Sequence, residues 1–163
     1  MTEIFHTESA QEILKAKNKE LDDWLRHEVY EEVDDIGQPY ITVRWVITPK
    51  LIEGKLGTKA RLCARGFEEE IEFRTDSPTC MRESVKGGSC IIAAKRWDLH
   101  SIDFKTAFLQ GKKIKRVVCL KPPVESKTKK LWKLKKTVYG LADAPREWFL
   151  CLKEELLRGQ PAK

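Results

Sequence analysis

Residues 99–104 alternate between polar and apolar side chains, and the alternation includes a carboxylate. Ile102 and Phe104 fall on one face of an extended chain, while Ser101 and Asp103 fall on the other. This pattern predicts a half-buried strand over residues 98–104. An aspartate at the end of such a strand suits a divalent cation such as Mg²⁺, which prefers hard oxygen ligands. A lone aspartate there is also typical of a turn or cap.

Residues 40–65 predict an antiparallel hairpin. Residues 40–49 are rich in β-branched and aromatic side chains, residues 53–57 supply turn residues, and residues 59–64 return as a second strand. On the return strand the alternation places Lys59, Arg61, Cys63 and Arg65 on one face, three of them cations. A row of cationic side chains can prevent an edge strand from pairing with a strand of another chain. It can also bind phosphate, which suits the planar fork of guanidinium.

Helical patterns lie on both sides of these strands. A capping box at residues 9–12 predicts a helix over residues 10–26, followed by an acidic loop at residues 31–35. Each of the paired glycines at 87 and 88 costs ~1 kcal/mol in a helix interior, so a helix in this part of the chain is expected to begin late, near residue 89. Asp143 fits the N-cap of a final helix that ends before residue 159.

Charge is divided unevenly along the chain. Residues 1–39 hold 4 basic and 11 acidic residues, whereas residues 40–163 hold 27 and 14. Residues 112–136 contain 11 of these basic residues and one acid, Glu125, around two short strands predicted at 117–120 and 131–134. This density indicates a sequence-independent nucleic-acid track rather than an ordinary solvated surface. The candidate contacts are Lys129, Lys130, Lys133 and Lys135.

Length and composition exclude several classes of protein. With 163 residues, 41% hydrophobic and 34% charged, the chain suits a globular domain and not a disordered segment. The apolar runs are far shorter than the ~18 residues of a membrane span. Neither a signal peptide nor paired cysteines are apparent, which predicts an intracellular protein, in the cytoplasm or nucleus, with reduced thiols and no zinc site.

Four stretches, in order, resemble the reverse transcriptases of copia-type retrotransposons. Residues 103–111 (DFKTAFLQG) resemble motif A of that family. Two stretches precede them. The first consists of RWV at 44–46 and KARLCARGF at 59–67, and the second is DSPT at 76–79. The last stretch, VYGLADAPREW at 138–148, follows them. The resemblance covers roughly residues 10–158. Many relatives have Lys-Gln where this chain has Ala142 and Asp143.

The resemblance implies an α+β fold, namely the fingers and partial palm of a right-hand polymerase, with an antiparallel sheet and packed helices. Residues 1–39 would be an acidic helical lead segment, and residues 40–163 a partial reverse transcriptase domain. Within that domain the fingers hairpin would span residues 40–65, the motif A strand residues 98–104, and motif B with its helix residues 138–158.

The resemblance also implies site roles. In the family, two Mg²⁺ ions assist attack of a primer 3′-hydroxyl on a nucleotide. Asp103 would be the catalytic metal ligand, aided by the backbone carbonyl of Phe104. Lys59 and Arg61 would bind the triphosphate of the dNTP, and Phe108 would lie under its sugar, unless it simply packs in the core. Tyr139 and Gly140 would position the incoming base on an RNA or DNA template-primer.

The family's second metal motif, Tyr-x-Asp-Asp, has no counterpart in this sequence. The chain is therefore expected to be a part of the polymerase that is inactive alone and that self-associates through an incomplete palm. A non-catalytic basic nucleic-acid-binding module and a translated transposon relic are the alternatives.

Overall fold

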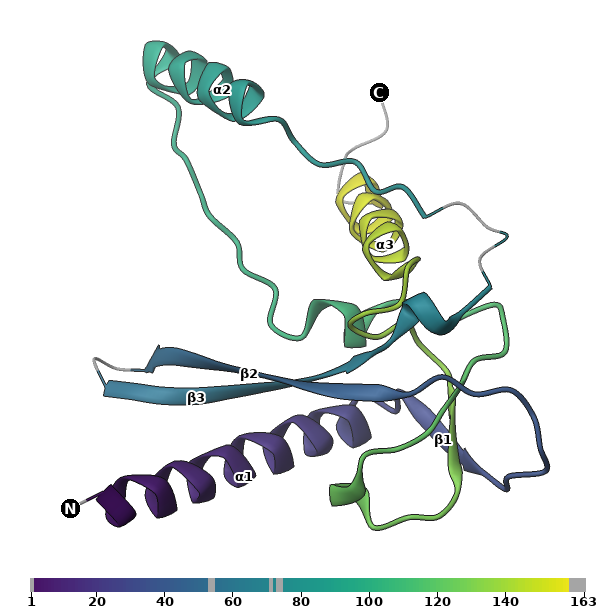
Figure 1. Ribbon diagram of the computed structural model, residues 1–163. Coiled ribbons are helices and arrows are strands. Elements are labelled where there is room, and N and C mark those ends of the chain that lie inside the picture. The colour runs from purple at the N-terminus through teal and green to yellow at the C-terminus, as the bar shows by residue number, and fades with distance from the viewer. Residues whose placement is uncertain (1, 53–54, 71, 73–74, 159–163) are drawn as a thin grey trace.

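The computed structural model describes residues 2–52, 55–70, 72 and 75–158 (Figure 1). Within these residues it combines helices with two antiparallel sheets, which confirms the expected α+β class. The helices are α1 (Thr2–Arg26), α2 (Arg82–Lys95) and α3 (Ala144–Arg158). The strands are β1 (Tyr30–Val33), β2 (Val43–Ile52), β3 (Lys55–Ala64), β4 (Cys119–Leu120) and β5 (Leu131–Leu134).

The predicted hairpin is confirmed as β2 and β3, which pair antiparallel with Trp45 opposite Leu62. The turn predicted at residues 53–57 is wrong for residues 55–57, which belong to β3 and pair with residues 50–52, and residues 53 and 54 lie outside the described residues. Along β3 the residues Ala60, Leu62 and Ala64 are buried. Helix α1 runs alongside the hairpin (Figure 1), and the fully buried Trp24 of α1 belongs to the same core cluster as Leu62. The hairpin therefore has one face in the core and one face available to other groups.

A second sheet has the strand order β1-β5-β4. The strand predicted at 131–134 is confirmed as β5, and the one predicted at 117–120 is confirmed in its second half, which is β4. The predicted acidic loop at 31–35 is wrong in its first half, which is strand β1. Tyr30 of β1 stacks on Trp132 of β5 with ring centroids 4.0 Å apart, and Trp132 also contacts Trp24. This aromatic packing and the pairing with β5 hold the acidic stretch as a strand.

The segment around α2 projects away from both sheets (Figure 1). The predicted late start near residue 89 is wrong, because α2 begins at Arg82 and includes both glycines. The strand predicted at residues 98–104 is also wrong: these residues form no strand, and Ile102 is 72% exposed. Strand formation needs a neighbouring strand for the backbone hydrogen bonds, and no described strand pairs with this stretch.

The turn before α3 docks on the outer edge of β3. The Ala64 N–H donates to the Tyr139 carbonyl at 2.7 Å, and the Gly66 N–H donates to the Gly140 carbonyl at 3.2 Å. Gly140 has φ of +91°, and a Cβ there would lie 2.0 Å from the Ala64 carbonyl oxygen. Only glycine fits this approach. The docking brings the stretches at 59–67 and 138–148 together.

None of the helices in the described ranges combines the length and the apolar character that crossing a membrane requires.

Candidate functional site

Lys59, Arg61 and Cys63 share the face of β3 opposite the buried one, as predicted, and each is partly exposed. Burial lowers the pKa of Lys59, and the nearby Arg61 lowers it further. Asp103 acts in the opposite direction on Lys59, so the two side chains interact electrostatically although they are 44 positions apart. The structure thus brings the cationic strand face and the motif A aspartate into one region.

Asp103 is an exposed side chain in this region. Among the described residues, no group of three or more His, Cys, Asp or Glu side chains comes together. A Mg²⁺ site with carboxylate ligands needs more than one such oxygen donor from protein and substrate together. The described residues therefore do not build a two-metal centre, and the assignment of Mg²⁺ to Asp103 and the Phe104 carbonyl stays a prediction.

Two aromatic contacts join the motif A and motif B stretches. Phe108, on the 3-10 helix η2 (Ala107–Gln110), meets Tyr139 edge to face at 5.1 Å. Phe104 meets Trp148 of α3 in the same manner at 5.3 Å. Burial raises the pKa of Tyr139. Phe108 is thereby held by packing against the core, which is the alternative to a sugar contact, and its side chain is half-buried.

The lysines of the predicted nucleic-acid track are largely engaged in ion pairs. Lys133 lies 3.2 Å and Lys135 lies 3.9 Å from carboxylate oxygens of Glu31, and Lys130 lies 3.2 Å from Asp34. Lys129 is exposed. The pairing of β1 with β5 therefore sets the acidic lead segment against the track. The opposite charges of residues 28–35 and 127–136 were the signal in the sequence that could have indicated this pairing.

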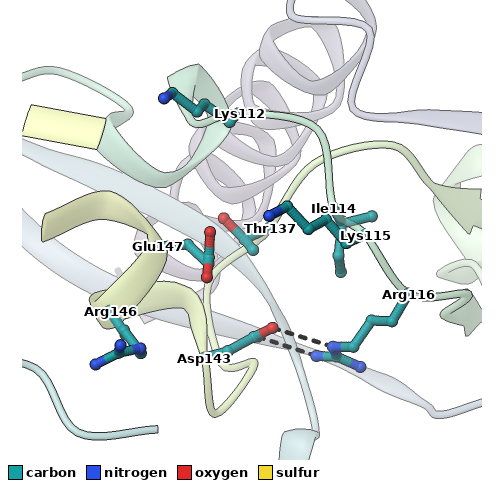
Figure 2. Close-up of a pocket in the computed structure, with 8 residues that line it drawn as sticks. All are labelled: Lys112, Ile114, Lys115, Arg116, Thr137, Asp143, Arg146 and Glu147. Atoms are coloured by element: carbon teal, nitrogen blue, oxygen red, sulfur yellow. Dashed lines mark hydrogen bonds and ion pairs between the residues drawn. The ribbon is translucent and has the colours of Figure 1, made fainter. Parts of the chain in front are cut away.

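A surface pocket of about 390 Å³ lies beside the start of α3 (Figure 2). Asp143 accepts hydrogen bonds from Arg116 Nε at 3.0 Å and from Nη2 at 2.9 Å, and Arg116 also pairs with Glu69. Burial alone would lower the pKa of Arg116. The hydrogen bonds to Asp143 and Glu69 outweigh that effect, so the pKa of Arg116 is raised. Asp143 directly precedes α3, as predicted for its N-cap, and its backbone carbonyl accepts a hydrogen bond from the Glu147 N–H at 2.9 Å. Both of its carboxylate oxygens bind Arg116, which the sequence did not predict.

A second pocket, of about 350 Å³, lies where residues 42–45 meet residues 121–125. The Trp45 Nε1–H donates to Glu125 at 3.0 Å, and the Lys17 ammonium donates to the other oxygen of Glu125 at 2.6 Å. Burial raises the pKa of Glu125, but the hydrogen bonds from Lys17 and Trp45 outweigh it, so the pKa is lowered overall. Sequence reasoning missed this pocket, because its walls come from two segments that lie about 80 positions apart in the sequence.

The similarity to known proteins covers the part of the chain that contains these stretches. The sequence model described as reverse transcriptase (RNA-dependent DNA polymerase) matches residues 27–160. The chain is 31% identical over 130 residues to the retrovirus-related Pol polyprotein from transposon RE2 of Arabidopsis thaliana, covering 73% of this chain and 9% of that protein. It is 32% identical over 122 residues to the corresponding RE1 polyprotein of the same plant, covering 70% and 8%.

A third relative is the retrovirus-related Pol polyprotein from transposon TNT 1-94 of Nicotiana tabacum, with 27% identity over 160 residues, 92% of this chain and 12% of that protein. The chain therefore spans only about a tenth of the length of the curated relatives it matches. No solved structure matches it.

Proposed function

Since the chain belongs to the reverse transcriptase family of transposon Pol polyproteins, as its resemblance to the copia-type enzymes predicted, we propose that it forms the fingers and the beginning of the palm of an RNA-directed DNA polymerase. Its working surface is the junction of β3, η2 and the turn before α3. The single observation that carries this proposal is that Tyr139 joins three family motifs there: its carbonyl accepts a hydrogen bond from the Ala64 N–H at the end of β3 at 2.7 Å, and its ring packs edge to face on Phe108.

In this proposal the chain's own residues bind and orient a nucleotide. Lys59 and Arg61 contact the triphosphate, because ammonium and guanidinium groups form strong hydrogen bonds to phosphate oxygens. The edge-to-face contact with Tyr139 fixes the Phe108 ring, against which a sugar can pack. The Gly140 turn, held on β3 by Ala64 and Gly66, carries Tyr139 to this surface.

Magnesium would supply charge neutralisation for nucleotidyl transfer, but the described residues do not fit a two-metal centre. We therefore propose that the isolated 163-residue chain binds its substrates without joining them. The same observation favours the second candidate, a non-catalytic nucleic-acid-binding module. The two candidates differ in dNTP binding, which only the polymerase assignment requires.

The test is the affinity of the chain for a dNTP that carries a fluorophore on its base, measured by anisotropy. Replacing Lys59 and Arg61 together by alanine should weaken binding at least tenfold, because a hydrogen bond to a charged group contributes about 1.5–3 kcal/mol. The control replaces Lys15 and Lys19, two exposed lysines of α1, and removes the same charge. Equal losses in both variants, or no dNTP binding by the original chain, would refute the polymerase assignment.

A further inference from the structure

Arg116 lies in the segment between η2 and β4 and joins two acids that come from other parts of the chain. Its Nε and Nη2 donate to the two carboxylate oxygens of Asp143 (Figure 2), and its Nη1 and Nη2 donate to those of Glu69. Only 9% of the Asp143 side chain and 10% of the Glu69 side chain are exposed. Since burial withdraws both acids from water, the Arg116 guanidinium is what compensates their charge.

The two acids flank a close contact between two stretches of backbone. The Gly66 N–H donates to the Gly140 carbonyl at 3.2 Å, and a Cβ on Gly66 would lie 2.3 Å from that oxygen. Glu69 follows Gly66 by three positions, and Asp143 follows Gly140 by three positions. The contact thus brings both carboxylates within reach of one guanidinium. Without Arg116 it would set two like charges against each other.

The turn that contains Gly140 also carries Tyr139, whose ring packs on Phe108. Arg116 follows Phe108 by eight positions, and Asp143 follows Tyr139 by four. The ion pair between Arg116 and Asp143 therefore joins the segment that carries Phe108 to the segment that carries Tyr139. The Arg116 segment is anchored in turn, because the backbone N–H of residue 114 donates to the carbonyl of residue 135 at 2.8 Å.

These contacts assign Arg116 a role at the surface formed by β3, η2 and the turn before α3. We propose that Arg116 is a positioning residue for dNTP binding: by binding Glu69 and Asp143 together, it holds the turn before α3 on β3 and the Tyr139 ring against Phe108. A lysine would not replace it, because an ammonium group lacks the planar fork that bonds both oxygens of a carboxylate. The inference rests on the proposed function, since it concerns how the dNTP surface is held in shape, and it gives Arg116 no contact with the dNTP.

The test follows dNTP affinity and the surroundings of Tyr139 in the same variants. The chain has three tyrosines, so uniform labelling with fluorotyrosine gives three fluorine NMR resonances, and Tyr139→Phe identifies the one that belongs to Tyr139. Arg116→Ala should shift this resonance. It should also weaken binding of the base-labelled dNTP by roughly two- to tenfold, the loss that corresponds to one aromatic contact.

The matched control is Arg158→Ala. Arg158 of α3 also pairs with two acids, Glu154 and Glu155, but at an exposed position, so the variant removes the same charge without leaving buried acids behind. It should leave the Tyr139 resonance and the dNTP affinity unchanged. Equal effects of the two variants, or an unshifted Tyr139 resonance in Arg116→Ala, would overturn the proposal.

A second variant separates positioning from stabilisation, because Arg116→Ala leaves two buried acids without their cation and can unfold the chain. Arg116→Met combined with Glu69→Gln and Asp143→Asn removes all three charges together, and replacements of this kind are often neutral for stability. The urea midpoint of this triple variant should stay close to that of the unaltered chain, while the Tyr139 resonance shifts and the dNTP affinity falls. A triple variant with the original resonance and affinity would show that Arg116 only neutralises the two acids, and the proposal would fall.

The outcomes separate this proposal from the polymerase assignment. If the chain binds dNTP through Lys59 and Arg61 but Arg116→Ala changes neither the affinity nor the Tyr139 resonance, the positioning role is refuted and the polymerase assignment stands. If the unaltered chain binds no dNTP, the polymerase assignment falls, and the Tyr139 resonance alone decides whether Arg116 holds the turn.

Discussion

Glu20 of α1 is a charged residue inside the core. It is 6% exposed, and one of its carboxylate oxygens accepts hydrogen bonds from the Leu62 backbone N–H at 3.2 Å and from Trp24 Nε1–H at 3.3 Å. Burial raises the pKa of Glu20 above its ordinary value of 4.5, and the two hydrogen bonds only partly oppose that effect. The nearby Asp23 raises it further, whereas Lys59 lowers it.

Replacing Glu20 by glutamine should therefore stabilise the protein at neutral pH. Because the folded pKa exceeds 4.5, the folded state binds more protons than the unfolded state above that pH, and the free energy of unfolding falls as the pH rises through the folded pKa. Glutamine keeps an oxygen acceptor for Leu62 and Trp24 but does not titrate. Urea unfolding at several pH values should show the two proteins converging below pH 4.5.

The control for this prediction is Glu12→Gln, an exposed position on the same helix. It should leave the pH dependence of the original chain unchanged. A Glu20→Gln protein that is less stable than the original at neutral pH would show that the charged form is favoured in the core.

Gly140 should be intolerant of any side chain. Alanine at φ of +91° costs roughly 1–2 kcal/mol, and its Cβ would also clash with the Ala64 carbonyl oxygen, 2.0 Å away. Gly37 is a matched control, because it has φ of +87° and no atom within 4 Å of the added Cβ. Gly140→Ala should therefore lower the free energy of unfolding by clearly more than Gly37→Ala. Equal losses would mean that the turn before α3 is not docked on β3.

Helix α2 illustrates how an element can form without packing. None of its residues is buried, and an added Cβ at Gly87 or Gly88 would meet no atom within 4 Å. Replacing both by alanine should stabilise the helix by ~1 kcal/mol each. The gain should be local, visible as slower amide exchange in residues 82–95, with the global unfolding midpoint unchanged. A higher global midpoint would show that α2 unfolds together with the sheets.

Local patterns predicted the elements whose partners lie close in sequence or whose periodicity is strong. The hairpin and its buried Ala60, Leu62 and Ala64 follow from alternation, and the extent of α3 follows from its apolar stripe and stop residues. The first half of the acidic stretch was assigned wrongly because its strand character comes from β5, about 100 positions away. Residues 98–104 alternate as a strand does, yet lack a described partner strand.

The candidate site likewise has features that local periodicity predicts and contacts that it does not. The shared face of Lys59 and Arg61 follows from the period of β3 alone. The Arg116–Asp143 pair and the contact of Trp45 with Glu125 join side chains 27 and 80 positions apart, respectively. Each of those residues has an ordinary local interpretation as a cap, a solvated charge or a strand aromatic. Nothing in the sequence ranks one distant partner above another, so such contacts could not be predicted.

At the scale of the whole molecule, the acidic lead segment determines which lysines are engaged in ion pairs and which are not. The chain has a net charge of +6, but β1 sets Glu31 against Lys133 of β5 and against Lys135, which directly follows β5. Exposed pairs of this kind contribute little to stability, in the range of ~0–1 kcal/mol. Their larger effect is on recognition, because they redirect a polyanion toward cations without acidic neighbours.

Whether the chain binds substrates without joining them is decided by a primer-extension assay. The isolated chain is incubated with a labelled primer annealed to an RNA template, all four dNTPs, and Mg²⁺ or Mn²⁺. Binding should be detectable as a mobility shift, and the primer should remain unextended, since the described residues form no cluster of metal ligands. Extension that disappears in Asp103→Asn, while the mobility shift is retained, would contradict this and show a complete catalytic centre.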